Sequence, residues 1–409
     1  MTEHDRFAAF RHLSFRRYFA SRFGAAFGAQ VLSVSVGWQI YEETRNAVWL
    51  GWIGLVQFLP ALLLVVVTGV AADRIGRRLI MGVAMLAELV CAAGILVLSV
   101  MGRFDPVLVL VLLTLFGVAR AFLSPASSAL AVNLVPREDF ANAVGWTASS
   151  WQLASIAGPA LGGFIYFFSP LGAYATSAFA FGVSAALIFS IPKPVQRISK
   201  EPTTLSTLLG GFSYVWKEKV VFGAISLDLF AVLLGGAVAL MPIYANDILQ
   251  IGPIGNGLLR TAPAIGAILM VIIITRFPIR DHAGIILFVS VGLFGAATVV
   301  FGASQIAWLS ILALMLVGGF DMVSVMIREV LLQLWTPDEV RGRVNAVNSI
   351  FLGASNELGE ARAGFMAAQL GAVITVVGGG AAAMGVAALW AAMFPKLRTA
   401  RHLDHAERD

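Results

Sequence analysis

The sequence predicts an all-α membrane protein with twelve transmembrane helices in two pseudo-symmetric six-helix bundles. Three observations predict this fold class. Apolar residues make up 59% of the 409-residue chain and charged residues only 12%, which is too little charge to cover a water-soluble surface. Apolar runs of about 20 residues, long enough to cross a hydrocarbon core of roughly 30 Å, recur along the whole chain. Lysine and arginine concentrate in alternate connections between these runs.

Each apolar run is expected to be a helix, because lipid offers no partner to the backbone of an open strand. The boundaries of the runs are defined to within about 2 to 4 residues. The twelve predicted spans cover residues 17–41, 48–71, 79–101, 107–131, 142–168, 171–191, 220–245, 254–275, 284–303, 306–333, 343–369 and 372–394.

The basic residues predict the orientation of the spans. With both termini in the cytoplasm, the outer connections hold only Arg45 and Arg103, and the other basic residues outside the spans lie in inner segments. This bias is the positive-inside signal. It accounts for the net charge of +5 without a nucleic-acid partner. Residues 1–17 lack an apolar core followed by a cleavage site, so no signal peptide is expected.

The chain divides near its midpoint at the only long polar stretch between spans. This stretch contains Pro192, Pro194 and Pro202 and leaves six spans on each side. Matching Asn-Ala-Val triplets at 142–144 and 345–347 open the fifth and eleventh spans, as two parallel repeats would. The predicted parts are a cytoplasmic lead-in at 1–16, a bundle at 17–191, a cytoplasmic linker at 192–219, a bundle at 220–395 and a cytoplasmic tail at 396–409.

Aromatic residues alternate with arginines in and just after the lead-in. The pattern predicts an amphipathic segment lying on the inner membrane surface. The aromatic residues concerned are Phe7, Phe10, Phe15, Tyr18 and Phe19.

The fifth span carries small residues along one face. Ala154, Gly158 and Gly162 fall four apart, so a neighbouring helix can approach backbone to backbone. Pro159 lacks a backbone donor and is expected to bend the span. Ordinary packing glycines of a membrane bundle are the alternative interpretation. The whole stripe comprises Gly145, Ala154, Gly158, Pro159, Gly162 and Gly163.

The inner end of the second span reads Gly69-Val-Ala-Ala-Asp73-Arg74-Ile-Gly76-Arg77-Arg78. It resembles the loop signature of the major facilitator superfamily, G-x-L-A-D-R-x-G-R-K, departing at Ala71 and Arg78. The stripe of the fifth span resembles the antiporter signature of the same superfamily, with Ala154 in place of glycine. Residues 122–163 and 336–360 are similar to the branch that contains the bacterial enterobactin exporters and related drug–proton antiporters.

The resemblance implies the major facilitator fold in the inner membrane of a bacterium. It further implies proton-coupled export, by alternating access, of a small amphiphilic molecule such as a siderophore or a drug, with multidrug resistance as one outcome. In related transporters the loop is an inner latch, and Gly69, Asp73, Arg74, Gly76, Arg77 and Arg78 would form it here. Asp73 can accept hydrogen bonds or pair with an arginine, and Gly76 allows a tight reversal. The alternative is a positive-inside turn with a solvated aspartate.

Ionisable residues inside spans are costly and therefore functional candidates. Asp228 is the first candidate for a carboxyl that binds and releases a proton; Asp321, a later candidate, either faces the cavity or pairs with an arginine on another helix. The second candidate is the pair of Glu357 and Glu360, which share a helix face. Two carboxylates this close do not both stay ionised, although pairing with arginines is an equal alternative. Glu88 is either a packing carboxyl or functional. Four further residues are expected to reach an interface: Arg260, Arg328, Glu329 and Arg362.

A substrate cavity needs apolar walls with a few polar anchors. The first span offers a polar stripe at helical spacing, the fourth span one arginine, and the fifth span an aromatic residue beside an amide. Such groups suit an amphiphilic molecule with an aromatic or acidic part. The predicted cavity residues are Gln30, Ser33, Trp38, Arg120, Trp151 and Gln152.

Nothing in the sequence resembles an enzyme site or a phosphate-binding loop, so an ion gradient and not ATP is the expected energy source. Cys91 is the only cysteine, which excludes an intramolecular disulfide and a cysteine metal cluster. His402 and His405 fall in the polar tail and predict no metal site. No cofactor is expected, and the protein is predicted to be monomeric. The alternatives are an uptake symporter or a lysophospholipid flippase on the same fold, or a membrane receptor that transports nothing.

Overall fold

The computed structural model describes residues 7–131, 133–193, 205–279 and 281–399, and within these ranges the chain is helical and contains no strand. Contacts divide the chain into two compact units. Unit 1 comprises Met1–Gln39 and Leu59–Thr204, and unit 2 comprises Ile40–Phe58 and Leu205–Asp409. The predicted linker falls largely at residues 194–204, outside the described ranges, as do Arg280, the tail from residue 400 and the first six residues.

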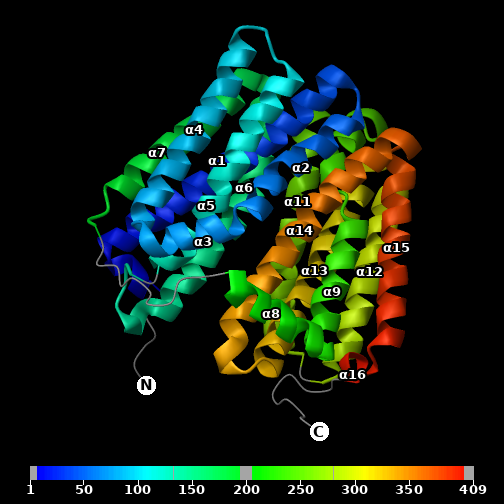
Figure 1. Ribbon diagram of the computed structural model, residues 1–409. Helices are drawn as coiled ribbons and strands as arrows, with labels where there is room; N and C mark the ends of the chain where they lie inside the picture. The colour runs from blue at the N-terminus through cyan, green and yellow to red at the C-terminus, as the bar shows by residue number, and fades with distance from the viewer. Residues whose placement is uncertain (1–6, 132, 194–204, 280, 400–409) are drawn as a thin grey trace. The chain divides into compact units, whose positions relative to one another are not determined.

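The first half of the chain forms six spans among the described residues. Its second span is divided into two helices, and the other spans are single helices. The helices are α1 (Leu13–Thr44), α2 (Ala47–Leu63), α3 (Val65–Arg74), α4 (Arg77–Val100), α5 (Pro106–Ala131), α6 (Phe140–Phe168) and α7 (Pro170–Phe189) (Figure 1). Short 3-10 turns precede α1 and α6, at Ala8–Arg11 and Arg137–Asp139.

The second half repeats this pattern after one additional helix, α8 (Leu205–Lys217). Its first span is interrupted, and the other five are single helices. The segments are α9 (Lys219–Gly235), a 3-10 turn (Val238–Leu240), α10 (Met241–Ile243), a π-helical turn (Tyr244–Ile248), α11 (Gly252–Arg276), α12 (Ala283–Ala303), α13 (Ala307–Trp335), α14 (Asp338–Leu370), α15 (Ala372–Met393) and α16 (Pro395–Arg398).

These segments match the twelve predicted spans in order, so the predicted fold class is confirmed for the described residues. The largest difference is the start of the eleventh span, predicted at 343 and found at Asp338. Among the described residues, eight helices are long and apolar enough to be recognised as spans by length and composition alone. The spans of α1, α2 with α3, α6 and α14 do not meet those criteria, because they are interrupted or contain more polar residues.

Two interruptions were not predicted. The second span breaks at Leu64, where φ is −97° and ψ is 3°. The seventh span breaks after Gly235, and the chain resumes as short turns around Pro242. Adjacent glycines have weak helix propensity, and Pro242 cannot donate a hydrogen bond to the preceding turn. The sequence therefore contains the cause of the second interruption, although its length and apolarity suggested one continuous helix.

In unit 1, α1 packs between α6 and α7. Glycines of α1 face α7: a Cβ added to Gly28 would lie 3.2 Å from both the Ser177 carbonyl oxygen and the Ala180 Cβ. On the opposite contact, the glycines of α6 face α1. Small residues at both contacts allow backbones to approach closely, which is the main source of helix association in lipid.

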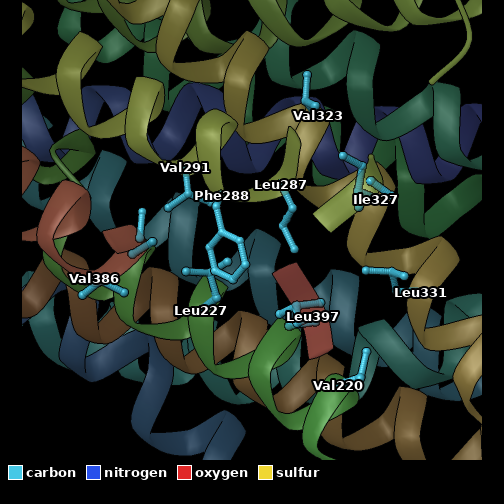
Figure 2. Close-up of a cluster of buried hydrophobic side chains, with 14 of the residues drawn as sticks. Val220, Leu227, Leu287, Phe288, Val291, Val323, Ile327, Leu331, Val386 and Leu397 are labelled. Carbon is cyan, nitrogen blue, oxygen red and sulfur yellow. The ribbon is translucent and has the colours of Figure 1, made fainter. Parts of the chain in front are cut away.

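In unit 2, a buried apolar cluster joins α9, α11, α12, α13, α15 and α16 (Figure 2). Its labelled members include Leu227, Phe288, Ile327, Val386 and Leu397. Leu397 and Ile327 are fully buried. The cluster holds α9 and α13 together over the length that carries the charged residues described below.

Residues 40–58 belong to unit 2 although they precede its main body in the chain. The first part of α2 packs on α14, with the rings of Trp52 and Phe365 5.6 Å apart. A Cβ added to Gly51 would lie 2.9 Å from the Ala361 carbonyl oxygen, and one added to Gly54 would lie 3.2 Å from the Glu360 Cβ. These glycines therefore mark a close helix contact.

The aromatic lead-in differs from its prediction. Phe15 and Tyr18 are fully buried inside unit 1 and are core residues, not membrane-surface residues. Phe7 stacks on Trp146 of α6 at 5.3 Å, and Phe10 meets the same ring edge-on at 5.0 Å. The physical reason is that the indole at the start of α6 offers these rings a protein partner.

Candidate functional site

Unit 1 contains a cavity of about 290 Å³ lined by α1, α4, α5 and α6. Its charged residues are Arg22 from α1, Glu88 from α4 and Arg120 from α5. The remaining wall combines sulfur, hydroxyl and indole groups and a few apolar side chains. The most polarisable and polar members are Met81, Met85, Ser124, Ser127, Ser128 and Trp151.

The three charges of this cavity are held differently. Arg22 donates from Nη1 to the Ser127 hydroxyl, and Ser127 also contacts the Tyr18 hydroxyl at 3.1 Å. Glu88 is 1% exposed, and its Oε2 atom has no hydrogen-bond partner among the described residues. Arg120 interacts electrostatically with Glu88 and lies 6.0 Å from the centre of the Phe116 ring.

Two of the predicted substrate residues, Arg120 and Trp151, line this cavity, whereas Gln30, Ser33, Trp38 and Gln152 are not among its lining residues. Gln30 instead packs against Gly158 of α6 and lies 3.5 Å from the Ser155 hydroxyl. Trp38 is 4% exposed. A substrate role for these four residues stays a prediction.

Sequence reasoning missed Arg22 as a candidate for the cavity. The signal was available, because Arg22 falls inside the predicted first span and ionisable residues within spans are functional candidates. Glu88 was noticed but left open. Its burial beside a cavity could not be inferred from α4 alone.

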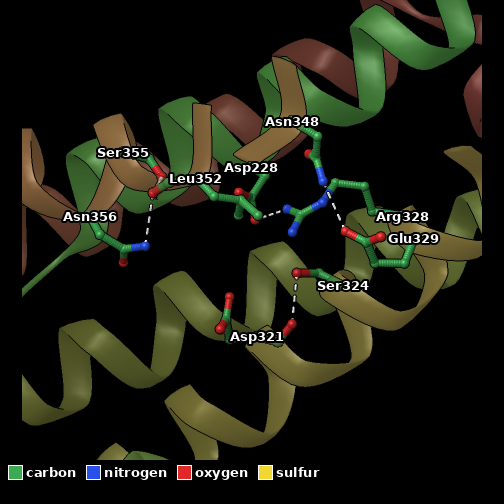
Figure 3. Close-up of polar contacts among 9 residues, drawn as sticks. All are labelled: Asp228, Asp321, Ser324, Arg328, Glu329, Asn348, Leu352, Ser355 and Asn356. Carbon is green, nitrogen blue, oxygen red and sulfur yellow. Dashed lines mark hydrogen bonds and ion pairs between the residues drawn. The ribbon is translucent and has the colours of Figure 1, made fainter. Parts of the chain in front are cut away.

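Unit 2 places three charged residues of two helices together (Figure 3). Asp228 of α9 forms an ion pair with Nη1 of Arg328 on α13. Arg328 is 1% exposed and Asp228 8%. The expectation that Arg328 reaches an interface is therefore wrong: its side chain is drawn inward by a carboxylate on the neighbouring helix. Asp228 is not the isolated carboxyl that the sequence suggested.

Asp321 lies on α13, and the charges of both Asp228 and Arg328 act on it. It lines a second cavity, of about 150 Å³, together with Asn356 of α14 and residues 235–238, where the seventh span is interrupted. Asp321 therefore lies beside a cavity, and the arginine that acts on it, Arg328, lies on its own helix and not on another.

A hydrogen bond and an electrostatic interaction join α14 to its neighbours. Asn348 donates to Glu329 at 2.9 Å, so Glu329 has a partner inside the unit. Arg260 of α11 interacts electrostatically with both Glu357 and Glu360. The pairing that was the alternative to proton exchange at these two glutamates thus has a specific arginine.

The small-residue stripe of α6 faces α1, as the close approach of a neighbouring helix requires. A Cβ added to Gly162 would lie 2.6 Å from a Val34 methyl and 3.1 Å from the Val31 Cα. Ala154 and Gly163 are buried, and α6 runs through Pro159 without a break. Gly145 differs, because an added Cβ there would meet nothing within 4 Å.

The latch motif joins α3 to α4. The turn does not need a glycine conformation, since Gly76 has φ −58° and ψ 118°, and the predicted reason for a glycine there is not supported. Arg78 donates to the Phe189 carbonyl at 2.6 Å, and Arg17 donates to the Ser190 carbonyl at 2.5 Å. Both arginines thus satisfy carbonyls at the carboxyl end of α7, where positive charge is favourable.

The remaining members of the latch motif are less informative. Gly69 lies within α3 and Arg74 is its last residue, while Arg77 is the first residue of α4. The Asp73 side chain lies outside what the structure describes. The latch stays a prediction.

Comparison with known proteins gives consistent results. A family model described as transmembrane secretion effector matches residues 4–409. Macrolide efflux protein A of Streptococcus pyogenes is 28% identical over 239 residues, which is 57% of each chain, so the match spans little more than half of that relative. The enterobactin exporter EntS of Shigella boydii serotype 4 is 26% identical over 379 residues, covering 90% of this chain and 87% of the relative.

A solved bacterial homolog of the human lysosomal transporter Spinster, in an inward-facing and unoccupied conformation, has a TM-score of 0.74. The comparison covers 94% of this chain and 98% of that chain at 14% identity, and it shows the fold alone. The predicted superfamily is confirmed by the family match and by these relatives. The chain belongs to the transmembrane secretion effector family of the major facilitator superfamily, and it is a multi-pass membrane transporter and not an enzyme.

Proposed function

We propose that this protein is a proton-coupled exporter of a small amphiphilic molecule, such as a siderophore or a drug, that works by alternating access. It acts as a monomer in the bacterial inner membrane, with both termini in the cytoplasm. The direction of transport is supported by the two relatives named above, an efflux protein and an exporter. The single observation that carries the coupling is the cluster of Asp228, Asp321 and Arg328.

The charge balance of this cluster argues for a proton. Two carboxyl groups and one guanidinium act on one another inside unit 2. The single positive charge of Arg328 can balance one carboxylate, and Asp228 is the carboxylate that pairs with it directly. A second uncompensated negative charge in a buried site costs several kcal/mol, so the remaining carboxyl is most stable with a proton bound. Asp321 is that carboxyl.

The surroundings of Asp321 supply a route for the proton. Its cavity is bounded by the interruption of the seventh span at residues 235–238. Helix interruptions at membrane depth occur where the backbone lines a cavity, and they leave carbonyl groups without helical partners. Such a cavity can hold the water that carries a proton to the carboxyl. Glu357 and Glu360, which interact with Arg260, are the second candidates for this role.

The test is transport by everted membrane vesicles, with an imposed pH gradient and either a labelled macrolide or labelled enterobactin. The wild-type protein should accumulate at least one of them only while the gradient is present. Asp321→Asn should lose the accumulation of substrate against its concentration gradient, because an amide cannot bind and release a proton. Exchange of substrate down its concentration gradient should remain. Glu138→Gln is the matched control, since Glu138 is an exposed carboxyl of the other unit, and it should behave as wild type.

Other outcomes contradict parts of the proposal. Accumulation by Asp321→Asn at the wild-type rate would remove Asp321 from coupling, and the same test on Glu357→Gln/Glu360→Gln would then decide the second candidate. Movement of substrate in the opposite direction would identify an uptake symporter. Transport of neither compound with any gradient would favour another substrate class, such as lysophospholipid, or a receptor.

A further inference from the structure

The cavity of unit 1 holds a buried carboxyl whose hydrogen bonding is incomplete. Buried polar atoms are nearly always paired, so an unpaired one needs an explanation. Glu88 is 1% exposed, lines a cavity of about 290 Å³, and has an Oε2 atom without a hydrogen-bond partner among the described residues. The cavity lies near the lower end of the size range of sites for small organic molecules, which is roughly 300–1,000 Å³. The cavity is therefore large enough for a small ligand, and one of its buried polar atoms lacks a hydrogen-bond partner.

The charges around the cavity favour an anion. Arg22 and Arg120 bring two positive charges against the single negative charge of Glu88. The remaining wall helix adds no charge, because α6 contains no charged residue. Arg22 is already bonded to Ser127. Arg120 is thus the guanidinium that can turn to a ligand, and guanidinium binds carboxylate or phenolate oxygens strongly.

The uncharged walls favour an aromatic ring beside the acidic group. Trp151 offers an indole face, and Met81 and Met85 offer polarisable thioethers that pack well on rings. Hydroxyl groups of Ser124 and Ser128 lie in the same wall and can meet polar ring substituents. This combination differs from a site for a simple inorganic anion, which needs no apolar face.

We propose that this cavity binds an aromatic organic anion through Arg120 and that Glu88 is an internal substitute for the anion, competing with it for the same guanidinium. In the empty site Glu88 balances Arg120, and the charge of Arg22 leaves the cavity with one excess positive charge. A bound anion replaces Glu88 beside Arg120 and brings the charges of the cavity to balance. The inference rests on the proposed function only in that the ligand would be the acidic part of the exported molecule.

Binding can be tested on purified full-length protein in lipid nanodiscs without any gradient. Calorimetric titration would use salicylate as the probe and salicylamide as its uncharged counterpart of similar size. The wild-type protein should bind salicylate and bind salicylamide more weakly. Arg120→Gln should lower the affinity for salicylate roughly ten- to hundredfold, because one charge-assisted interaction is lost. The affinity for salicylamide should remain nearly unchanged.

The direction in which Glu88→Gln changes the affinity for salicylate distinguishes a competitor of the ligand from a partner of the ligand. Removal of the competing charge should raise the affinity for salicylate several-fold without a comparable effect on the affinity for salicylamide. The matched controls are Arg103→Gln, in the loop between α4 and α5, and Glu138→Gln, both exposed in unit 1; neither should change either affinity. A change caused by general loosening of the bundle would alter both probes together.

The proposal fails if wild-type protein does not bind salicylate at millimolar concentration, or if salicylamide binds equally well. It also fails if Glu88→Gln weakens salicylate, because Glu88 would then be a partner of the ligand and not its competitor. Failure of the export assay alone leaves this result standing, since no transport is measured. If the protein exports substrate but Arg120→Gln does not change salicylate binding, this inference is contradicted and the proposed function remains intact.

Discussion

Arg328 is among the largest fully buried side chains of the described residues. Its ion pair with Asp228 shows how charge is accommodated inside an apolar unit: one group is tolerable only because the other is present. The sequence predicted that charged residues within spans would matter. It could not predict which acid meets which base, because Asp228 and Arg328 lie on separate helices and their pairing depends on the register between α9 and α13.

At this scale we predict that Asp228→Asn lowers the stability of the protein by about 3–5 kcal/mol, because it removes the carboxylate that pairs directly with the buried Arg328. The double variant Asp228→Asn/Arg328→Met should recover most of the loss, since no charge then remains unpaired. Unfolding of the purified variants in detergent, followed by circular dichroism, would measure both. Equal stability of the wild type and Asp228→Asn would mean that the pair is solvated in the membrane.

At the scale of helices, the contact between α6 and α1 depends on glycine. We predict that Gly158→Leu and Gly162→Leu impair export while leaving membrane insertion largely intact, because a larger side chain collides with Gln30 in one case and with Val31 and Val34 in the other. Gly145→Leu on the same helix is the control, since its position is open.

Transport assays and membrane yields of the three variants would decide between two roles for the stripe. Selective loss in Gly158→Leu and Gly162→Leu supports a close contact that export requires. Full transport by all three would show that the α6–α1 contact tolerates bulk and that the stripe is ordinary packing.

The sequence predicted the boundaries of long helices well but did not predict the interruptions inside two spans. Periodic apolar runs determine long helices well, so α4, α11 and α12 begin and end within a few residues of their predictions. The interruptions at Leu64 and Gly235 are local conformations inside apolar runs, where hydropathy carries no signal. The cavity beside Asp321 depends on the interruption after Gly235. Adjacent glycines and Pro242 mark that interruption in the sequence, but the hydropathy used to define the spans does not register them.

For the whole molecule, the arginine bias predicts that both termini and the linker face the cytoplasm. Single cysteines in a Cys91→Ala background test this, because Cys91 is buried and the only natural cysteine. In intact cells Arg103→Cys should react with a membrane-impermeant maleimide, whereas Glu201→Cys should react only after permeabilisation. Labelling of Glu201→Cys from outside would overturn the orientation.

Residues 40–58 belong by packing to unit 2, although they are encoded within the first six spans. Helix α1, from Leu13 to Thr44, therefore starts in one unit and ends in the other. If the gene were split at the linker, the amino-terminal fragment would carry a segment whose packing partners, Asp247 and α14, are made by the other fragment. Two co-expressed halves thus contain a built-in means of complementing each other, and neither half contains the complete packing of its own sequence.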